Sequence, residues 1–187
     1  VLRAIPNLMI LSPATPRQVA ACVQTAYEHD GPVYIKIGMN HEKEYFEDGY
    51  VHDVKKSDCL RDGKNIAVFV TGSILDEAMK ACEMLEQNGI SVKLINVTTI
   101  KPFNENEVLD IVKKIKKIAV IEEHNIYGGL ASIISETIVY NGLNARVIPI
   151  GLNDTFAGGY GTHAMVRKVN QLDSISIYQR LKEACKE

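Results

Sequence analysis

The chain has 187 residues, of which 46% are apolar and 24% are charged, and its formal net charge is -2 at pH 7. This composition is typical of a globular protein that buries a core, and the slightly negative charge argues against binding to nucleic acid or to an anionic membrane surface. No apolar run approaches the roughly 18 residues of a membrane span, so no transmembrane helix is predicted.

The first residues predict a small strand–helix–strand piece. Residues 8–11 form a short apolar run that favours a buried strand. A helix is expected after Thr15, which can cap it, with Pro16 in the first turn and Gln18 able to reach back to the Thr15 amide. Residues 32–37 form a second apolar run, so residues 8–37 are predicted to make a separate β-α-β piece.

The character of the sequence changes between residues 38 and 64, where polar residues and turn signals gather. We place a domain boundary near residue 52, with one part at 1–52 and the other at 53–187. His41 and His52 flank this linker, and no third residue stands at a metal-ligand spacing, so we expect both to be solvent-exposed. Residues 58–61 are expected to form a short edge strand.

From residue 66 onward, strands alternate with helices. This alternation predicts a three-layer α/β/α domain around a mostly parallel five-stranded sheet, whose edge strand at 58–61 runs antiparallel. Ser73 with Asp76, and Asn104 with Glu107, have the spacing of helix caps. The expected strands cover residues 66–71, 91–97, 117–121 and 146–150, and the expected helices begin at Gly72-Ser73, near Asn104, after Gly128-Gly129 and at Ser174.

Glu122-Glu123-His124 ends a predicted strand, at the edge where open α/β sheets bind ligands. Two carboxylates and an imidazole can perform acid–base chemistry or bind a metal. Adjacent strand residues point to opposite faces, however, so the three side chains cannot all converge. A structural or interface role is therefore favoured over catalysis, and Gly128-Gly129 can let the following helix approach the sheet closely.

The remaining motifs give weaker signals. Gly72-Ser73 follows a strand and could receive a phosphate, but without a Gly-rich fingerprint or a P-loop lysine a tight turn is favoured. His163 follows a glycine-rich loop that could pack against a partner. No nucleophile elbow is present. No Cys-x-x-Cys pair is present either, which favours free thiols in a reducing cytoplasm; the four cysteines are Cys22, Cys59, Cys82 and Cys185.

An ordered series of motifs resembles the C-terminal half of the transketolase and 1-deoxy-xylulose-5-phosphate synthase family. The resemblance spans nearly the whole chain. Its first motifs, similar to the end of the family's pyrimidine-binding domain, are Arg3-Ala4-Ile5-Pro6-Asn7, Leu11-Ser12-Pro13 and Gly31-Pro32-Val33-Tyr34-Ile35-Lys36. Those similar to its C-terminal domain are Asp62-Gly63-Lys64-Asn65-Ile66, Thr71-Gly72, Thr99-Ile100-Lys101-Pro102-Phe103, Glu122-Glu123-His124, Gly128-Gly129 and Gly151-Leu152-Asn153-Asp154-Thr155-Phe156.

This resemblance implies a fragment or subunit of an enzyme that transfers two-carbon ketol units with thiamine diphosphate and magnesium. In the family, the Gly-Asp-Gly diphosphate motif and the activating glutamate lie in segments that this sequence does not contain. The chain alone is therefore expected to be inactive and to bind no thiamine diphosphate. The resemblance further implies a homodimer, an N-terminal pyrophosphate-binding partner, and a contribution to dimerisation and to the edge of the substrate channel.

The sequence departs from the sugar-phosphate enzymes of this family at two positions after the Gly-Pro strand, where Lys36 and Met39 replace the usual arginines. We therefore expect an acceptor without a phosphate at that end, or one whose phosphate is held by other residues. His41 could bond a sugar hydroxyl there. Two other interpretations stay open: the β component of a 2-oxoacid dehydrogenase, and a non-catalytic assembly or regulatory module.

Overall fold

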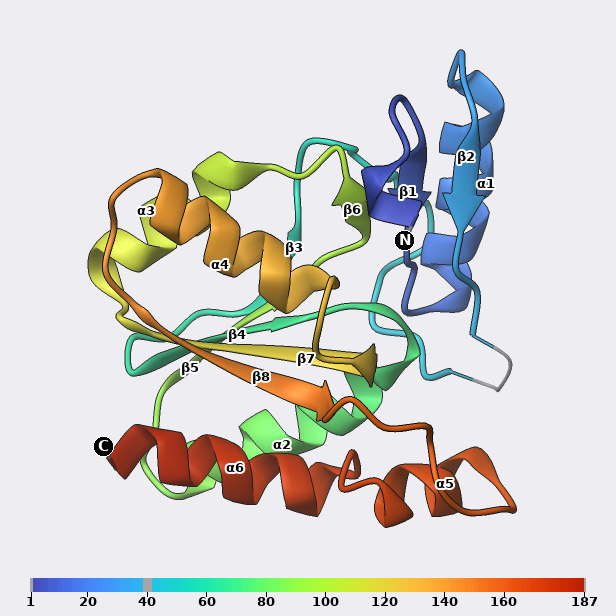
Figure 1. Ribbon diagram of the computed structural model, residues 1–187. Coiled ribbons are helices and arrows are strands. Elements are labelled where there is room, and N and C mark those ends of the chain that lie inside the picture. Colours follow the sequence, from blue (N-terminus) through green and yellow to red (C-terminus); the bar gives the residue numbers. More distant parts are fainter. Residues whose placement is uncertain (1, 39–41, 187) are drawn as a thin grey trace.

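The computed structural model describes residues 2–38 and 42–186, which form two sheets with their covering helices (Figure 1). The strands are β1 Met9–Leu11, β2 Val33–Ile35, β3 Asp58–Arg61, β4 Ile66–Val70, β5 Val92–Asn96, β6 Thr99–Lys101, β7 Lys117–Asn125 and β8 Arg146–Leu152. The helices are η1 Leu2–Ala4, α1 Pro16–Glu28, η2 Gly72–Ile74, α2 Leu75–Gln87, α3 Glu105–Lys114, α4 Leu130–Tyr140, α5 His163–Val169 and α6 Ser174–Lys186.

The larger sheet has the strand order β3-β5-β4-β7-β8. Strands β5, β4, β7 and β8 run parallel, and β3 pairs antiparallel with β5 at the edge. Every residue of β4 is buried, as expected of a parallel strand covered on both faces. The predicted five-stranded, mostly parallel sheet with an antiparallel edge strand is therefore confirmed.

Helices cover both faces of this sheet. One core packs α2 and α6 against one face, and a second core packs α3 and α4 against the other. Figure 1 shows these two layers above and below the strands. The three-layer α/β/α arrangement is thus confirmed, and it brings the carboxyl ends of β4, β7 and β8 to one open edge. In the described part of the chain, no helix is both long and apolar enough to cross a membrane.

The smaller sheet has the order β2-β1-β6. β1 and β2 run parallel and are connected through α1, which is the expected β-α-β piece. The third strand was not predicted: β6, from the later part of the chain, pairs antiparallel with β1. Its three residues are too few to show a strand period, so only the pairing reveals it.

Gln18 lies at the joint between the two parts and is completely buried. Its Oε1 accepts from the Ala14 amide at 2.9 Å, while its Nε2 donates to Asp58 Oδ2 at 2.8 Å and to Thr98 Oγ1 at 2.9 Å. Thr15 Oγ1 accepts from the Gln18 amide at 3.4 Å, as a helix cap should. The expected bond from the Gln18 side chain to the Thr15 amide is replaced by one to the Ala14 amide, while Nε2 points towards the second part of the chain.

Two predicted helix caps are wrong for a related reason: tertiary partners take the side chains. Ser73 Oγ donates to Glu123 Oε2 at 2.8 Å, and α2 begins without a side-chain cap after Ile74. Asn104 donates from Nδ2 to the Lys55 carbonyl at 2.6 Å, and Glu107 accepts from the Ser57 amide at 3.1 Å. Both of these contacts fasten the linker to α3.

His52 is buried, which corrects the expectation that it is solvent-exposed. Its Nε2 lies 3.0 Å from Thr99 Oγ1, so the linker packs against β6 rather than extending into solvent. Burial lowers the pKa of this imidazole. Cys22 and Cys82 are buried, and burial raises the pKa of each thiol to about 12.

Replacing Gln18 with Met is expected to reduce the free energy of unfolding by about 2–3 kcal/mol, because the near-isosteric side chain leaves the buried Ala14 amide without its acceptor and removes the hydrogen bonds to Asp58 and Thr98. Urea denaturation of the full-length protein measures this. Gln24→Met is the matched control, since Gln24 lies exposed on the same helix and bonds only Glu28; it should cost less than about 0.5 kcal/mol. If Gln18→Met and Gln24→Met reduce the free energy of unfolding equally, the hydrogen bonds of Gln18 add no specific stability.

Candidate functional site

The carboxyl end of β7 carries Glu122, Glu123 and His124, and the strand sends them to two faces as predicted. Glu122 and His124 lie on the α4 side. Glu123 points to the opposite side, towards η2 and α5. The three residues therefore build two adjacent polar clusters rather than one convergent triad.

Glu122 is only 2% exposed and caps the start of α4. Its Oε2 accepts from the Leu130 amide at 2.5 Å, and its Oε1 accepts from the Ala131 amide at 2.9 Å. A carboxylate is favourable at a helix N-terminus because it binds free N–H groups at the positive end of the helix dipole. The same Oε2 lies 3.1 Å from His124 Nε2, so both oxygens are committed.

Gly128 and Gly129 make this cap possible. A Cβ at Gly129 would lie 2.2 Å from Glu122 Oε2 and 2.5 Å from His124 Cε1, so no larger residue fits between strand and helix. Gly128 has φ of +76°, a backbone conformation that L side chains rarely adopt. The close approach of α4 to the sheet thus requires glycine at 129, whereas glycine at 128 is favoured by its backbone conformation.

His124 contacts an acceptor through each ring nitrogen. Nε2 faces Glu122, and Nδ1 lies 2.8 Å from the Asn125 carbonyl. The hydrogen bond to Glu122 raises the pKa of the imidazole; burial and the nearby Lys36 charge oppose this without cancelling it. The cationic form of His124 is therefore stabilised beside an anion.

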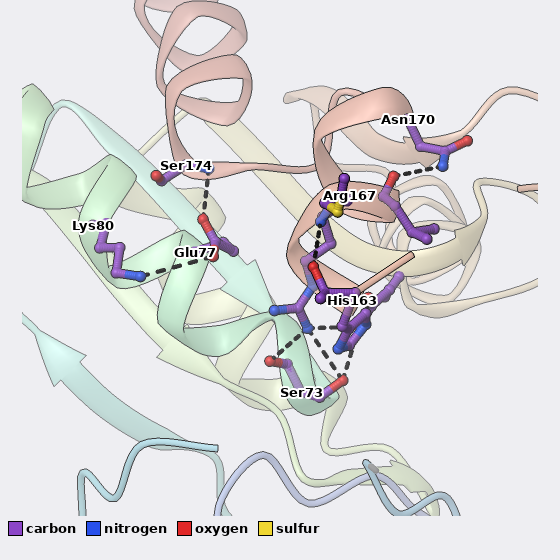
Figure 2. Close-up of polar contacts among 11 residues, drawn as sticks. Ser73, Glu77, Lys80, His163, Arg167, Asn170 and Ser174 are labelled. Carbon is purple, nitrogen blue, oxygen red and sulfur yellow. Dashed lines mark hydrogen bonds and ion pairs between the residues drawn. The ribbon is translucent and has the colours of Figure 1, made fainter. Parts of the chain in front are cut away.

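Glu123 forms the second cluster with Arg167, Ser73 and His163. Figure 2 shows the side chains of Arg167, Ser73 and His163 close together. Arg167 donates from Nε to Oε1 and from Nη2 to Oε2, both at 2.9 Å, which is the bidentate geometry of a strong ion pair. Ser73 Oγ donates to Oε2 at 2.8 Å, and His163 Nε2 contacts Oε1. Burial alone would raise the pKa of Glu123, but the Arg167 bonds and charge lower it overall.

Sequence reasoning missed Arg167 and the helix that carries it. The glycine-rich stretch before residue 162 is irregular, as expected, but the helix that follows it was not predicted. In the structure, Thr162 Oγ1 accepts from the Met165 amide at 3.3 Å and starts the two-turn helix α5. Only the Thr162 cap signals this helix in the sequence, and nothing in the local pattern pairs Arg167 with a strand 44 residues earlier.

Two cavities open at this edge, one for each cluster. The larger, about 580 Å³, is lined by Ser73, Glu123, His163 and Arg167 among others. The smaller, about 290 Å³, is lined by residues that include Glu122, His124, Gly128 and Gly129. Lys36, just after β2, lines both.

The structure thus brings the predicted Lys36 together with the Glu122–His124 segment. Met39 and His41 lie outside the described residues. No group of three or more His, Cys, Asp or Glu side chains in residues 2–38 and 42–186 is arranged to hold a metal ion. Both carboxylates of the site are already bound by amides or by Arg167, so they offer no ligand set for magnesium.

The raised pKa of His124 makes part of the stability depend on pH. The stabilisation from protonated His124 is fully present below the unfolded-state pKa, near 6.5, and is lost as pH rises through the higher folded-state value. Relative to His124→Gln, the wild type should therefore lose stability between pH 6 and pH 9. The side chain is 39% exposed, so solvent screening should keep the effect below about 1 kcal/mol. Chemical denaturation of both proteins at pH 6 and pH 9 measures this difference. If the free energy of unfolding changes equally with pH in the wild type and in His124→Gln, the prediction is wrong.

The Glu123–Arg167 pair should be strongly coupled. Arg167→Met leaves a largely buried carboxylate without its partner and should cost about 3 kcal/mol. The double variant Glu123→Gln/Arg167→Met should cost less than the sum of the two single changes, as a double-mutant cycle by urea denaturation would show. Asp110 and Lys113 form an exposed pair on α3, and the same cycle there should give a coupling below about 0.5 kcal/mol. If the coupling energy of Glu123 and Arg167 is as small as that of Asp110 and Lys113, the two residues do not form a strong ion pair and the prediction is wrong.

Comparison with known proteins places the chain in a family. Residues 55–174 match the family described as the transketolase C-terminal domain. A putative transketolase C-terminal section of Methanocaldococcus jannaschii is 34% identical over 190 residues, which cover 100% of this chain and 58% of that protein. A subunit of the apulose-4-phosphate transketolase of Actinobacillus succinogenes is 32% identical, over 95% of this chain and 57% of its own length.

A solved structure gives the same result for the fold. A split-gene transketolase, described as an inactive β4 tetramer, superposes with a TM-score of 0.89 at 25% identity. The match covers 99% of this chain and 59% of that one. The chain therefore spans somewhat over half the length of these relatives, and it belongs to the transketolase C-terminal domain family.

Proposed function

We propose that this chain is a C-terminal fragment or subunit of a transketolase-type enzyme, which transfers two-carbon ketol units together with an N-terminal part. The observation that carries this proposal is the pattern of coverage. Nearly the whole chain aligns with one protein named as a transketolase C-terminal section and with another named as a transketolase subunit. Both names denote one part of a divided enzyme.

The cofactor of the complete enzyme is proposed to be thiamine diphosphate with magnesium, which would supply the carbanion chemistry of the transfer. The described residues of this chain do not fit the diphosphate–magnesium group, because the carboxylates at the open edge are committed to α4 and to Arg167. We therefore assign cofactor binding to the pyrophosphate-binding partner, and we expect the isolated chain to be inactive.

Within this assembly, residues 1–52 are proposed to be the end of a pyrimidine-binding domain and residues 53–187 the C-terminal domain. Lys36 would stand at the edge of the substrate channel. Association is favoured by exposed aromatic side chains near the open edge: Phe156 is 100% exposed and Tyr160 98% exposed. We propose that such surfaces are covered in a homodimer and by the N-terminal partner.

Reconstitution tests the proposal. The full-length protein is co-expressed with its N-terminal partner, the protein from the same genome whose sequence carries the Gly-Asp-Gly motif. Ketol transfer is then assayed with thiamine diphosphate and magnesium. We expect a stable complex, thiamine-dependent transfer by the complex, and less than about 1% of that rate from either chain alone, since neither holds a complete site. Decarboxylation of a 2-oxoacid without ketol transfer would instead favour the dehydrogenase β component. If the two proteins form no complex and show no ketol transfer together, the proposal is wrong.

A further inference from the structure

A pocket of about 250 Å³ opens at the edge of the large sheet where its parallel strands begin. Lys117, the first residue of β7, lines it together with Lys182, Cys185 and Lys186 from the last turns of α6. In Figure 1, α6 ends at this edge, and α5 lies beyond the opposite edge, where the strands finish. The pocket shares no lining residue among those described with the two cavities of the candidate site, so it is a separate feature of the molecule.

Three ammonium groups converge on this pocket. Lys117 Nζ donates to the Cys185 carbonyl at 2.7 Å, which places its charge directly against the last turn of α6. Lys182 and Lys186 are four residues apart on α6, so they are neighbours on one helix face, with Cβ atoms about 6 Å apart. All three side chains line the same small volume, within reach of one bound molecule.

No described carboxylate compensates these charges, since none lines the pocket. Lys182 and Lys186 form no ion pair within residues 2–38 and 42–186, and Lys182 Nζ instead lies 5.3 Å from the centre of the Tyr178 ring. Cys185 supplies no negative charge, because burial raises the pKa of its thiol despite the nearby Lys117. Like charges four residues apart destabilise a helix, so a bound anion would relieve this repulsion.

The ends of the neighbouring helices do not account for all three lysines. Both α2 and α6 end here, and each helix end carries roughly half a negative charge, which is less in total than three ammonium charges. The end of α2 needs no lysine, because the amides of residues 88–90 donate to its last carbonyls at 2.9–3.0 Å. At the end of α6, Lys117 bonds a terminal carbonyl. Lys182 and Lys186 therefore have no capping role.

We propose that this pocket binds a small polyvalent anion, a polyphosphate or a polycarboxylate, with the ammonium groups of Lys182 and Lys186 as its donors and Lys117 as the third cation. The Cys185 carbonyl holds Lys117 in place. Lysine offers a mobile point charge rather than a planar fork, so the pocket selects the number of negative charges and not one geometry. The proposal goes beyond the proposed function and does not rest on it, because binding is measured without catalysis.

Calorimetry of the full-length protein tests this, with tripolyphosphate, citrate and inorganic phosphate titrated at one ionic strength without magnesium. Tripolyphosphate or citrate should bind saturably, and at least about tenfold more tightly than inorganic phosphate. Lys182→Gln/Lys186→Gln should weaken that binding at least about tenfold. The matched control, Lys114→Gln/Lys168→Gln, removes two exposed charges outside the pocket and should change affinity less than about twofold.

Thermal unfolding shows that each variant is folded, and the bound anion should raise the Tm of the wild type more than that of Lys182→Gln/Lys186→Gln. The proposal is overturned if neither tripolyphosphate nor citrate binds saturably up to about 5 mM, or if inorganic phosphate binds as tightly as both. It is also overturned if the pocket variant binds like the wild type, or if the control variant loses as much affinity as the pocket variant.

The same titrations identify the source of the anion. If tripolyphosphate alone binds tightly, with the expected loss in Lys182→Gln/Lys186→Gln, the pocket takes a polyphosphate. If citrate alone does so, it takes a polycarboxylate. Similar affinities for both, with the same dependence on the two lysines, show a pocket that recognises polyvalent anions by charge.

Discussion

The alternation of side chains at the carboxyl end of β7 organises the whole open edge of this protein. Because adjacent strand residues face opposite layers, Glu122 and Glu123 enter two different environments, and each must be compensated there. Glu122 is compensated by backbone amides at the start of α4, and Glu123 by Arg167 and Ser73. A one-residue slip of β7 would place each carboxylate against the wrong layer, so these two polar clusters also fix the strand register.

This alternation determines which helices pack at the open edge and how close each lies to β7. Glu122 holds the start of α4 against the strand. The space between them is so narrow that only Gly129, which has no side chain, fits there. On the other face, α5 has only two turns and no buried residues, so packing alone gives it little stability. Its position depends on the bonds from Arg167 to Glu123 and to the Ser73 carbonyl. The cavity walls on the two faces therefore have different origins, one from helix capping and the other from an ion pair.

The sequence predicts the parts of this protein that follow from local periodicity. Continuous apolar runs indicate the strands of the large sheet, and the glycine pair before Leu130 indicates where α4 begins. The prediction fails where a side chain prefers a distant partner: Ser73 and Asn104 have cap spacing but bond elsewhere, and His52 is buried against Thr99. A pairing such as Glu123–Arg167, between a strand and a short helix 44 residues later, leaves no local pattern, so it could be found only in the folded chain.

The joint at Gln18 explains why the two parts of the chain can line one cavity. Lys36 comes from the first part and Arg167 from the second, yet both line the larger cavity. Their separation is therefore set by the buried bonds between α1, β3 and the segment before β6. Fully buried polar groups of this kind are costly to separate, so the two parts should move together rather than as independent domains. A cut of the chain near residue 52 would therefore separate Lys36 from Arg167, which line the same cavity.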